Sequence, residues 1–149
     1  MAVFAVRRRV SWGDCDPAGI LYTPRAFDYG TEALERWYAE VFGTDWLSLK
    51  RSHNIGSPMV HASCDYLKAM APGLEIDVQV WIGRIGESSL TFRVEGVDLA
   101  GSIHFRAKYV ACITDASLNK AVAIPPALRL RAEAYRRECG DLSPEAGSG

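Results

Sequence analysis

Several features that would place this chain of 149 residues in a common protein class are missing. Its 4 cysteines are far apart and none forms a Cys-x-x-Cys pair, so neither a zinc site nor a disulfide framework is indicated. No apolar run approaches the ~20 residues of a membrane-spanning helix. The apolar first residues precede the arginines, which is the reverse of a signal peptide. We therefore expect a protein of the reducing cytoplasm with no membrane partner.

An excess of charge of one sign is also lacking. The sequence has 17 Lys and Arg against 18 Asp and Glu, which gives a formal net charge of −1. This balance creates no global field that would attract nucleic acid or an anionic membrane. We expect no nucleic-acid partner, and any recognition of phosphate must be local.

Two patterns of catalytic or metal-binding residues are absent as well. No serine lies in a Gly-x-Ser-x-Gly elbow, which excludes the α/β-hydrolase route to ester cleavage. Counted from Asp14, a calcium loop would need ligands where Ala18 and Arg25 stand. The sequence therefore predicts neither a metal nor an organic cofactor.

The most informative stretch is residues 11–24, which delivers the carboxylate of Asp16 just before a helix start. Thr23 followed by Pro24 is typical of an N-cap and a proline in the first helical position. A helix N-terminus offers unpaired N–H groups and roughly half a positive charge, which favour a developing oxyanion. A carboxylate beside it indicates acyl transfer or hydrolysis. We expect Asp14 to support the turn and Asp16 to be catalytic.

Hydrophobic periodicity predicts one long helix early in the chain and strands after it. The helix covers residues 24–42 and ends near Gly43, and Gly30 within it indicates close packing against another surface. Shorter helices are expected at residues 45–53, with Asp45 as N-cap, and at 127–139. Alternating or extended patterns predict strands at residues 4–12, 58–70, 76–82, 90–94 and 103–113.

This order of elements predicts an α+β fold in which one long helix is wrapped by a curved antiparallel sheet of about five strands. The short connections permit antiparallel pairing and leave no room for helical crossovers. We expect a single domain over residues 1–142 and a flexible C-terminal tail at 143–149. One helix covers one face of such a sheet, so partner subunits are expected to cover its edges.

Residues 13–20, Gly-Asp-Cys-Asp-Pro-Ala-Gly-Ile, together with Tyr22, Pro24 and the later Gly-Ser-Pro-Met-Val at 56–60, resemble the hotdog-fold thioesterases of the 4-hydroxybenzoyl-CoA thioesterase family. The resemblance implies a hotdog fold and hydrolysis of an acyl-CoA or aroyl-CoA thioester to free acid and CoA. It also implies that Asp16 is the catalytic carboxylate. The functional unit would be a homodimer or homotetramer whose active sites are shared across the dimer interface.

The expected chemistry uses Asp16 either as a nucleophile, which forms a mixed anhydride, or as a general base for water. Amide groups near Thr23 would polarise the thioester carbonyl. Hydration of an enoyl thioester is disfavoured because no His lies between Pro17 and Thr23. The candidate substrate-binding residues are Gly19 in the loop, Tyr22 and Thr31 as walls of the acyl pocket, and Arg84 and Arg93 for the CoA phosphates.

The residues expected to bind the CoA phosphates differ from those of the best-known aryl-thioesterases of this family. Glu-Ser-Ser at residues 87–89 stands where that pattern has a basic cluster. Two alternatives therefore stay open at the level of sequence. One is a thioesterase that acts on acyl-carrier-protein thioesters, and the other is a noncatalytic module that binds acyl thioesters.

Overall fold

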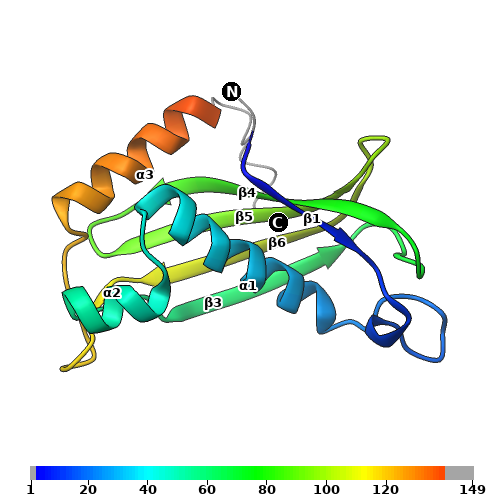
Figure 1. Ribbon diagram of the computed structural model, residues 1–149, viewed down its shortest axis with the longest axis horizontal. Helices are drawn as coiled ribbons and strands as arrows, with labels where there is room; N and C mark the ends of the chain where they lie inside the picture. The colour runs from blue at the N-terminus through cyan, green and yellow to red at the C-terminus, as the bar shows by residue number, and fades with distance from the viewer. Residues whose placement is uncertain (1–2, 140–149) are drawn as a thin grey trace.

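Five antiparallel strands curve around one long helix in the computed structural model, which describes residues 3–139 (Figure 1). Three short strands form a second, antiparallel sheet at one end. In spatial order the large sheet contains β1 (Ala5–Arg9), β4 (Glu75–Ile85), β5 (Ser89–Asp98), β6 (Ile103–Cys112) and β3 (Met59–Tyr66). The small sheet contains β2 (Ile55–Gly56), β7 (Thr114–Asp115) and β8 (Lys120–Ala121). The expected tail at 143–149 lies outside the described residues.

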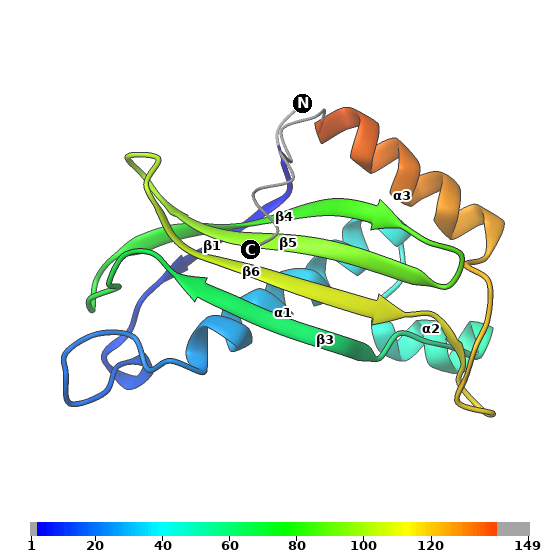
Figure 2. The ribbon, with the colours of Figure 1, turned by 180° about the vertical axis from the view of Figure 1, so that it is seen from behind.

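The long helix lies against the inner face of the curved sheet (Figures 1 and 2). It consists of α1 (Arg25–Trp37) and a π-helical continuation, η2 (Tyr38–Phe42), and it ends at Gly43 with φ of 72°. The positive φ is the left-handed conformation that glycine adopts without strain and that commonly terminates helices. The α+β hotdog architecture and the end of the helix near Gly43 are confirmed.

Gly30 permits the closest approach between α1 and the sheet. A Cβ atom at this position would overlap the hydroxyl of Tyr109 on β6 and lie 2.9 Å from its Cζ atom. The Tyr109 hydroxyl donates a hydrogen bond to the carbonyl of Phe27 at 3.2 Å, and the tyrosine is 2% exposed. The helix therefore carries a glycine because a buried tyrosine occupies the space of a side chain, as the sequence predicts.

Replacing Gly30 with Ala is expected to lower the free energy of unfolding by about 1–3 kcal/mol, because overpacking at Tyr109 outweighs the helix propensity gained, which is about 1 kcal/mol. Chemical denaturation of both proteins measures the difference. Gly13→Ala is the control, since its added Cβ would have no atom within 4 Å from any described residue other than Gly13 and its two chain neighbours. Equal stability of Gly30→Ala and the parent protein would contradict this packing argument.

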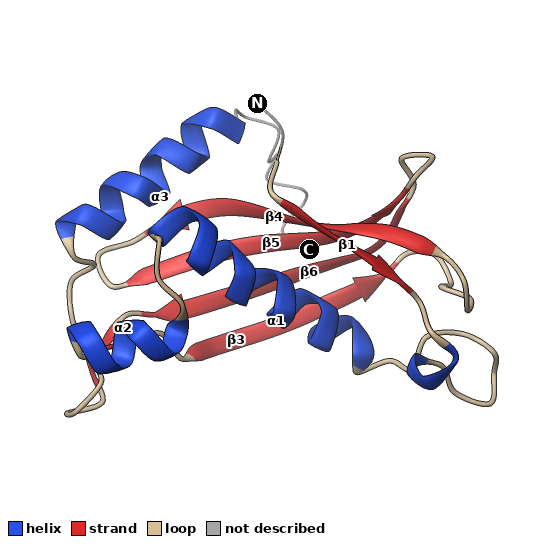
Figure 3. Cartoon of the chain, viewed as in Figure 1, coloured by secondary structure: helices blue, strands red, loops and turns tan. Residues whose placement is uncertain are grey.

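Aromatic packing fastens the last helix, α3 (Pro126–Cys139), to the far end of α1. The ring of Trp37, which is fully buried, meets Phe92 with centroids 4.9 Å apart and Tyr135 of α3 at 5.4 Å. The Tyr135 hydroxyl also donates to the carbonyl of Val80 at 2.5 Å. Helix α2 (Trp46–His53) follows the long helix in the chain (Figure 3). Asp45 caps it, since its carboxylate accepts the Ser48 amide at 2.7 Å, as expected.

Strand boundaries differ from the sequence-based expectation where the chain turns. The strand expected at residues 4–12 ends at Arg9, and Trp12 lies in a short 3₁₀ turn, η1 (Trp12–Asp14), where it is 81% exposed. Trp12 therefore does not continue the alternation of side chains along the strand, because the chain turns before it. The strand expected at 58–70 ends at Tyr66, and β4 and β5 are longer than expected.

Neither membrane spans nor metal-binding groups were found among residues 3–139. No helix in this range combines the length and apolar character needed to cross a bilayer. No three His, Cys, Asp or Glu side chains in it gather closely enough to hold a metal ion.

Candidate active site

The loop that carries Asp16 projects from one end of the sheet and leads directly into α1 (Figure 1). The Gly19 amide donates to the Asp16 carbonyl at 2.9 Å, which closes a four-residue turn with Pro17 in its second position. Gly19 has φ of 80°, and the Asp16 amide donates to the Ile20 carbonyl at 3.1 Å. Aspartate, proline and glycine favour these positions of a turn. The sequence therefore builds a tight turn whose first residue is Asp16.

The Asp16 carboxylate is anchored through one of its two oxygens. Oδ1 accepts the Ala18 amide at 2.9 Å, and Oδ2 receives no hydrogen bond from any other residue in the described part of the chain. The side chain is half-buried. Such a carboxylate has a fixed direction and a free oxygen, which suits either attack on a carbonyl or abstraction of a proton from water.

Asp14, by contrast, has both of its carboxylate oxygens engaged. Its side chain is 15% exposed and accepts the Tyr29 hydroxyl at 2.6 Å, and the guanidinium groups of Arg8 and Arg25 lie 4.0 and 3.8 Å away. Burial and the bond to Asp14 both raise the pKa of Tyr29, so this hydroxyl stays a donor. The Asp14 carbonyl also accepts the Tyr22 amide at 2.8 Å. These contacts tie the loop to α1 and leave the carboxylate little room for chemistry.

The start of α1 differs from the expected capping arrangement. The helix begins at Arg25 with Pro24 as its cap residue, and no side chain caps it, so the assignment of Thr23 as N-cap was wrong. The Arg25 amide, which a Thr23 hydroxyl would cap, donates instead to the Tyr22 carbonyl at 2.8 Å. A backbone turn thus takes the donor that the side chain was expected to satisfy.

Thr23 is nevertheless held firmly through its backbone. Its carbonyl accepts a hydrogen bond from the hydroxyl of Tyr66, at the end of β3. Its own amide has no acceptor among residues 3–139, and neither has the amide of Ala26. Of these two donors, the amide of the exposed Thr23 is the one that a ligand oxygen can reach, beside the loop that carries Asp16, because Ala26 is fully buried.

The structure places the two expected walls of the acyl pocket on different elements. Tyr22 lies in the loop and is 52% exposed. Thr31 lies on α1, partly buried and near Tyr109, whose pKa is raised by burial to about 12. Gly19, the third candidate for substrate contact, is exposed in the turn after Asp16.

The two arginines expected at the CoA phosphates lie away from the Asp16 loop of the same chain. Arg93 is on the sheet face opposite α1, 3.3 Å from the buried carboxylate of Glu95 and stacked over Trp81 with its Cζ 5.6 Å from the ring centroid. Arg84 is exposed near the end of β4. Glu75 is the first residue of that strand and follows Leu74, which binds Val10 where the Asp16 loop begins. At about 3.3 Å per residue, Arg84 lies roughly 30 Å along the strand from Glu75. One protomer therefore does not bring either cation to its own Asp16.

The contribution of Tyr66 was not predicted from the sequence. Its place in a strand pattern that alternates with Ala62 and Cys64 could have indicated that the three share one face. The bond to Thr23 spans 43 positions in the sequence, and no local signal reports it.

A family model described as "Thioesterase-like superfamily" matches residues 10–131. The chain belongs to this superfamily. The match confirms the family resemblance of the Asp-Pro-Ala-Gly loop and includes every candidate site residue.

Individual members of the thioesterase-like superfamily agree with this membership. A thioesterase superfamily protein from Jannaschia sp. CCS1 superposes with a TM-score of 0.83 at 33% identity, over 89% of this chain and 92% of that one. A 1,4-dihydroxy-2-naphthoyl-CoA thioesterase from Synechocystis has a TM-score of 0.79 at 20% identity, over 88% and 96% of the two chains, and shows the shared fold.

A curated relative in sequence is the 1,4-dihydroxy-2-naphthoyl-CoA hydrolase of a Picosynechococcus species. It is 31% identical over 78 residues, which are 52% of this chain and 53% of that protein. The match thus spans about half the length of that relative.

Proposed function

We propose that this protein hydrolyses an acyl-CoA or aroyl-CoA thioester to the free acid and CoA, with Asp16 as the catalytic carboxylate. The observation that carries the proposal is that two groups occur close together in the chain. One is the Asp16 carboxylate, of which one oxygen has no hydrogen bond within the described chain, and the other is the Thr23 amide at the start of α1, which has no acceptor there. Membership in the thioesterase-like superfamily supports the same reaction class.

In this mechanism the Thr23 amide donates a hydrogen bond to the thioester carbonyl oxygen. The interaction strengthens as negative charge develops on that oxygen, and one such donor is typically worth about 3–4 kcal/mol in the transition state. Asp16 then follows one of two routes. As a nucleophile it forms a mixed anhydride and expels the CoA thiolate, and water next cleaves the anhydride. As a general base it takes a proton from the water that attacks the carbonyl directly.

The functional unit that we propose is a homodimer built along β3. Within the described chain β3 pairs with β6 alone, so its other edge is open. Four successive residues of this strand, Val60 to Ser63, are exposed, and Val60 is 64% exposed. An open edge with exposed apolar side chains is a template for pairing with another strand. Because Tyr66 at the end of β3 bonds to Thr23, such an interface would reach the start of α1.

The substrates that we propose are aroyl or short-chain thioesters. The exposed aromatic rings of Trp12 and Tyr22 on the Asp16 loop suit a planar acyl group, and the curated relative is named for an aroyl-CoA substrate. A panel of CoA thioesters, read by the release of free thiol, tests the proposal. Turnover of benzoyl-type and short-chain substrates, with slower turnover of palmitoyl-CoA, is expected. Binding of thioesters without thiol release would support the noncatalytic module instead.

Recognition of CoA through its phosphates predicts a lower KM for a CoA thioester than for the matching pantetheine thioester. The advantage should shrink as salt screens the phosphates. Arg84→Ala should raise KM for the CoA substrate alone, with Arg36→Ala, another exposed arginine, as control. Arg93→Ala is less informative because it strips a cation from the buried Glu95. Equal KM values for both substrates at every ionic strength would reject phosphate recognition and favour a carrier-protein substrate.

A further inference from the structure

The connection between β3 and β4 holds both ends of the Asp16 loop. Where the loop begins, the Val10 amide donates to the Leu74 carbonyl at 2.9 Å and the Gly73 amide donates to the Val10 carbonyl at 2.8 Å. Where the loop ends, the Leu21 amide donates to the Met70 carbonyl at 2.8 Å. The position of the loop therefore depends on the shape of this one connection.

His104 fastens that connection to the sheet. It lies on β6 and is 6% exposed. Its carbonyl accepts the amides of Leu67 and Lys68 at 2.8 and 3.1 Å, and its Nδ1 lies 3.1 Å from the carbonyl oxygen of Ala69. Three successive residues before Met70 are thus bound to His104, and the Ala69 bond is the one made by its side chain.

The imidazole is in turn held by Asp98, at the end of β5. His104 Nε2 lies 2.8 Å from Asp98 Oδ2, while Oδ1 accepts the amides of Ala100 and Ser102 at 2.9 Å. The bond from His104, with help from these amides, lowers the pKa of Asp98. Both ring nitrogens face acceptors, so a protonated ring donates to both at once.

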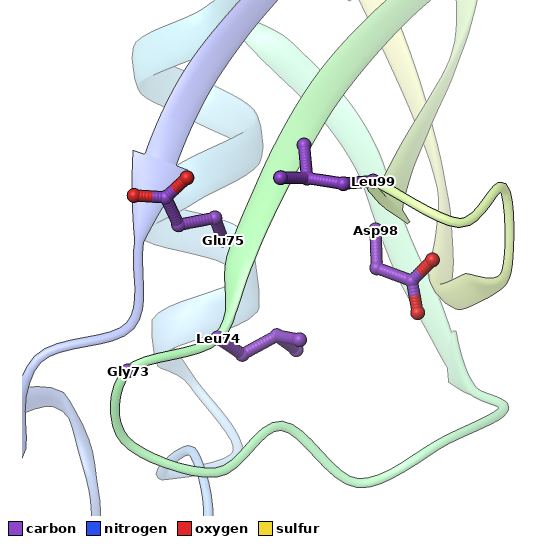
Figure 4. A pocket seen from close by; sticks show the side chains of 5 residues that line it. All are labelled: Gly73, Leu74, Glu75, Asp98 and Leu99. Atoms are coloured by element: carbon purple, nitrogen blue, oxygen red, sulfur yellow. The ribbon is translucent and has the colours of Figure 1, made fainter.

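Asp98 also borders a surface hollow at this end of the sheet. The hollow, of about 370 Å³, is lined by Gly73, Leu74, Glu75, Asp98 and Leu99 (Figure 4). Since the Asp98 oxygens are already engaged by His104 and the two hairpin amides, the carboxylate serves the connection and does not offer the hollow a free acid.

We propose that His104 is a positioning residue for the hydrolysis reaction: its imidazole, set by Asp98, holds the Ala69–Met70 bend that fixes Leu21 and with it the Asp16 loop. The inference rests on the proposed function. Leu21 is bridged to Cys15 across the loop, next to Asp16, so a shift at Met70 is passed to the catalytic carboxylate. Misplacement of a reacting group by about 1 Å can lower a rate ~10²-fold.

Two conservative substitutions separate the bonds of the imidazole. In His104→Asn the amide nitrogen replaces Nδ1, so the bond to Ala69 can persist while the bond to Asp98 is lost. In His104→Gln the longer side chain places its amide near Nε2, so the bond to Asp98 can persist while the bond to Ala69 is lost. We expect His104→Gln to lower kcat by about tenfold or more, with KM changed far less, and His104→Asn to retain more activity.

Amide hydrogen exchange measures the positioning without reference to activity. In His104→Gln the Leu21 amide should exchange at least about tenfold faster than in the parent protein, while the amide of Val94 in the middle of β5 should be unaffected. Unchanged exchange at Leu21, or a His104→Gln variant with parental kcat, would overturn the inference. A parent protein that cleaves no thioester would reject the proposed function and the effect of His104 on catalysis. The exchange result would still show whether His104 fixes the position of Leu21.

Discussion

The Asp16→Asn variant is expected to lose at least ~10²-fold in kcat, the low end for positioned acid–base catalysis. Asparagine preserves the shape of the side chain and can keep the turn in place. It removes the negative charge that both the nucleophilic and the general-base routes require. Substrate affinity should change far less, and because KM can mislead when chemistry is slow, binding is best measured with a nonhydrolysable thioester analogue.

Asp14→Asn provides the matched control within the same loop. Asp14 is bound by Tyr29 and lies near Arg8 and Arg25, so its substitution should reduce thermal stability more than it reduces kcat of the folded protein. A folded Asp16→Asn protein with near-parental kcat would exclude both routes through Asp16. Hydrolysis would then have to proceed without the Asp16 carboxylate.

Substitution of Val60 by Asp is expected to separate the proposed dimer and to lower activity by about 10²-fold, as expected when substrate-positioning groups are lost. Val60 is exposed on the open edge strand, and a buried, unpaired carboxylate there would oppose strand pairing. Light scattering at micromolar concentration should report a change from a multiple of 16.4 kDa to the single-chain mass.

Leu130→Asp is the control for this substitution, because Leu130 on α3 is 66% exposed against 64% for Val60. It should change neither the mass in solution nor the rate. A parent protein that is a fully active monomer would contradict the proposed dimer, and so would a monomeric Val60→Asp variant with full activity.

The parts of the fold that could be predicted are those set by local chemistry. Gly43 ends the long helix because a left-handed residue is needed there, and Asp45 begins α2 because its carboxylate caps a free amide. Gly30 could be recognised as a packing site because glycine inside a helix otherwise lowers stability. The tight turn after Asp16 likewise follows from its aspartate, proline and glycine.

The rest depends on contacts between distant residues. Arg93 lies against Glu95 and Trp81 on the sheet face away from α1, and its expected role toward the CoA phosphates stays a prediction. The bond between Asp98 and His104 forms where the pairing of β5 and β6 shifts register after Gly96. No local sequence pattern indicates this shift. Thr23 was assigned a cap through its hydroxyl, whereas the structure fixes it through Tyr66 and gives its amide no acceptor among the described residues.

The most direct test of the proposed site is a crystal structure of the Asp16→Asn variant with intact benzoyl-CoA. We expect the thioester carbonyl oxygen about 2.7–3.1 Å from the Thr23 amide nitrogen. We expect the carbonyl carbon about 3–3.5 Å from the substituted side chain at position 16, or one water molecule away if the parent residue acts as a base. A thioester carbonyl bound away from the Thr23 amide, with the side chain at position 16 facing solvent, would contradict the account.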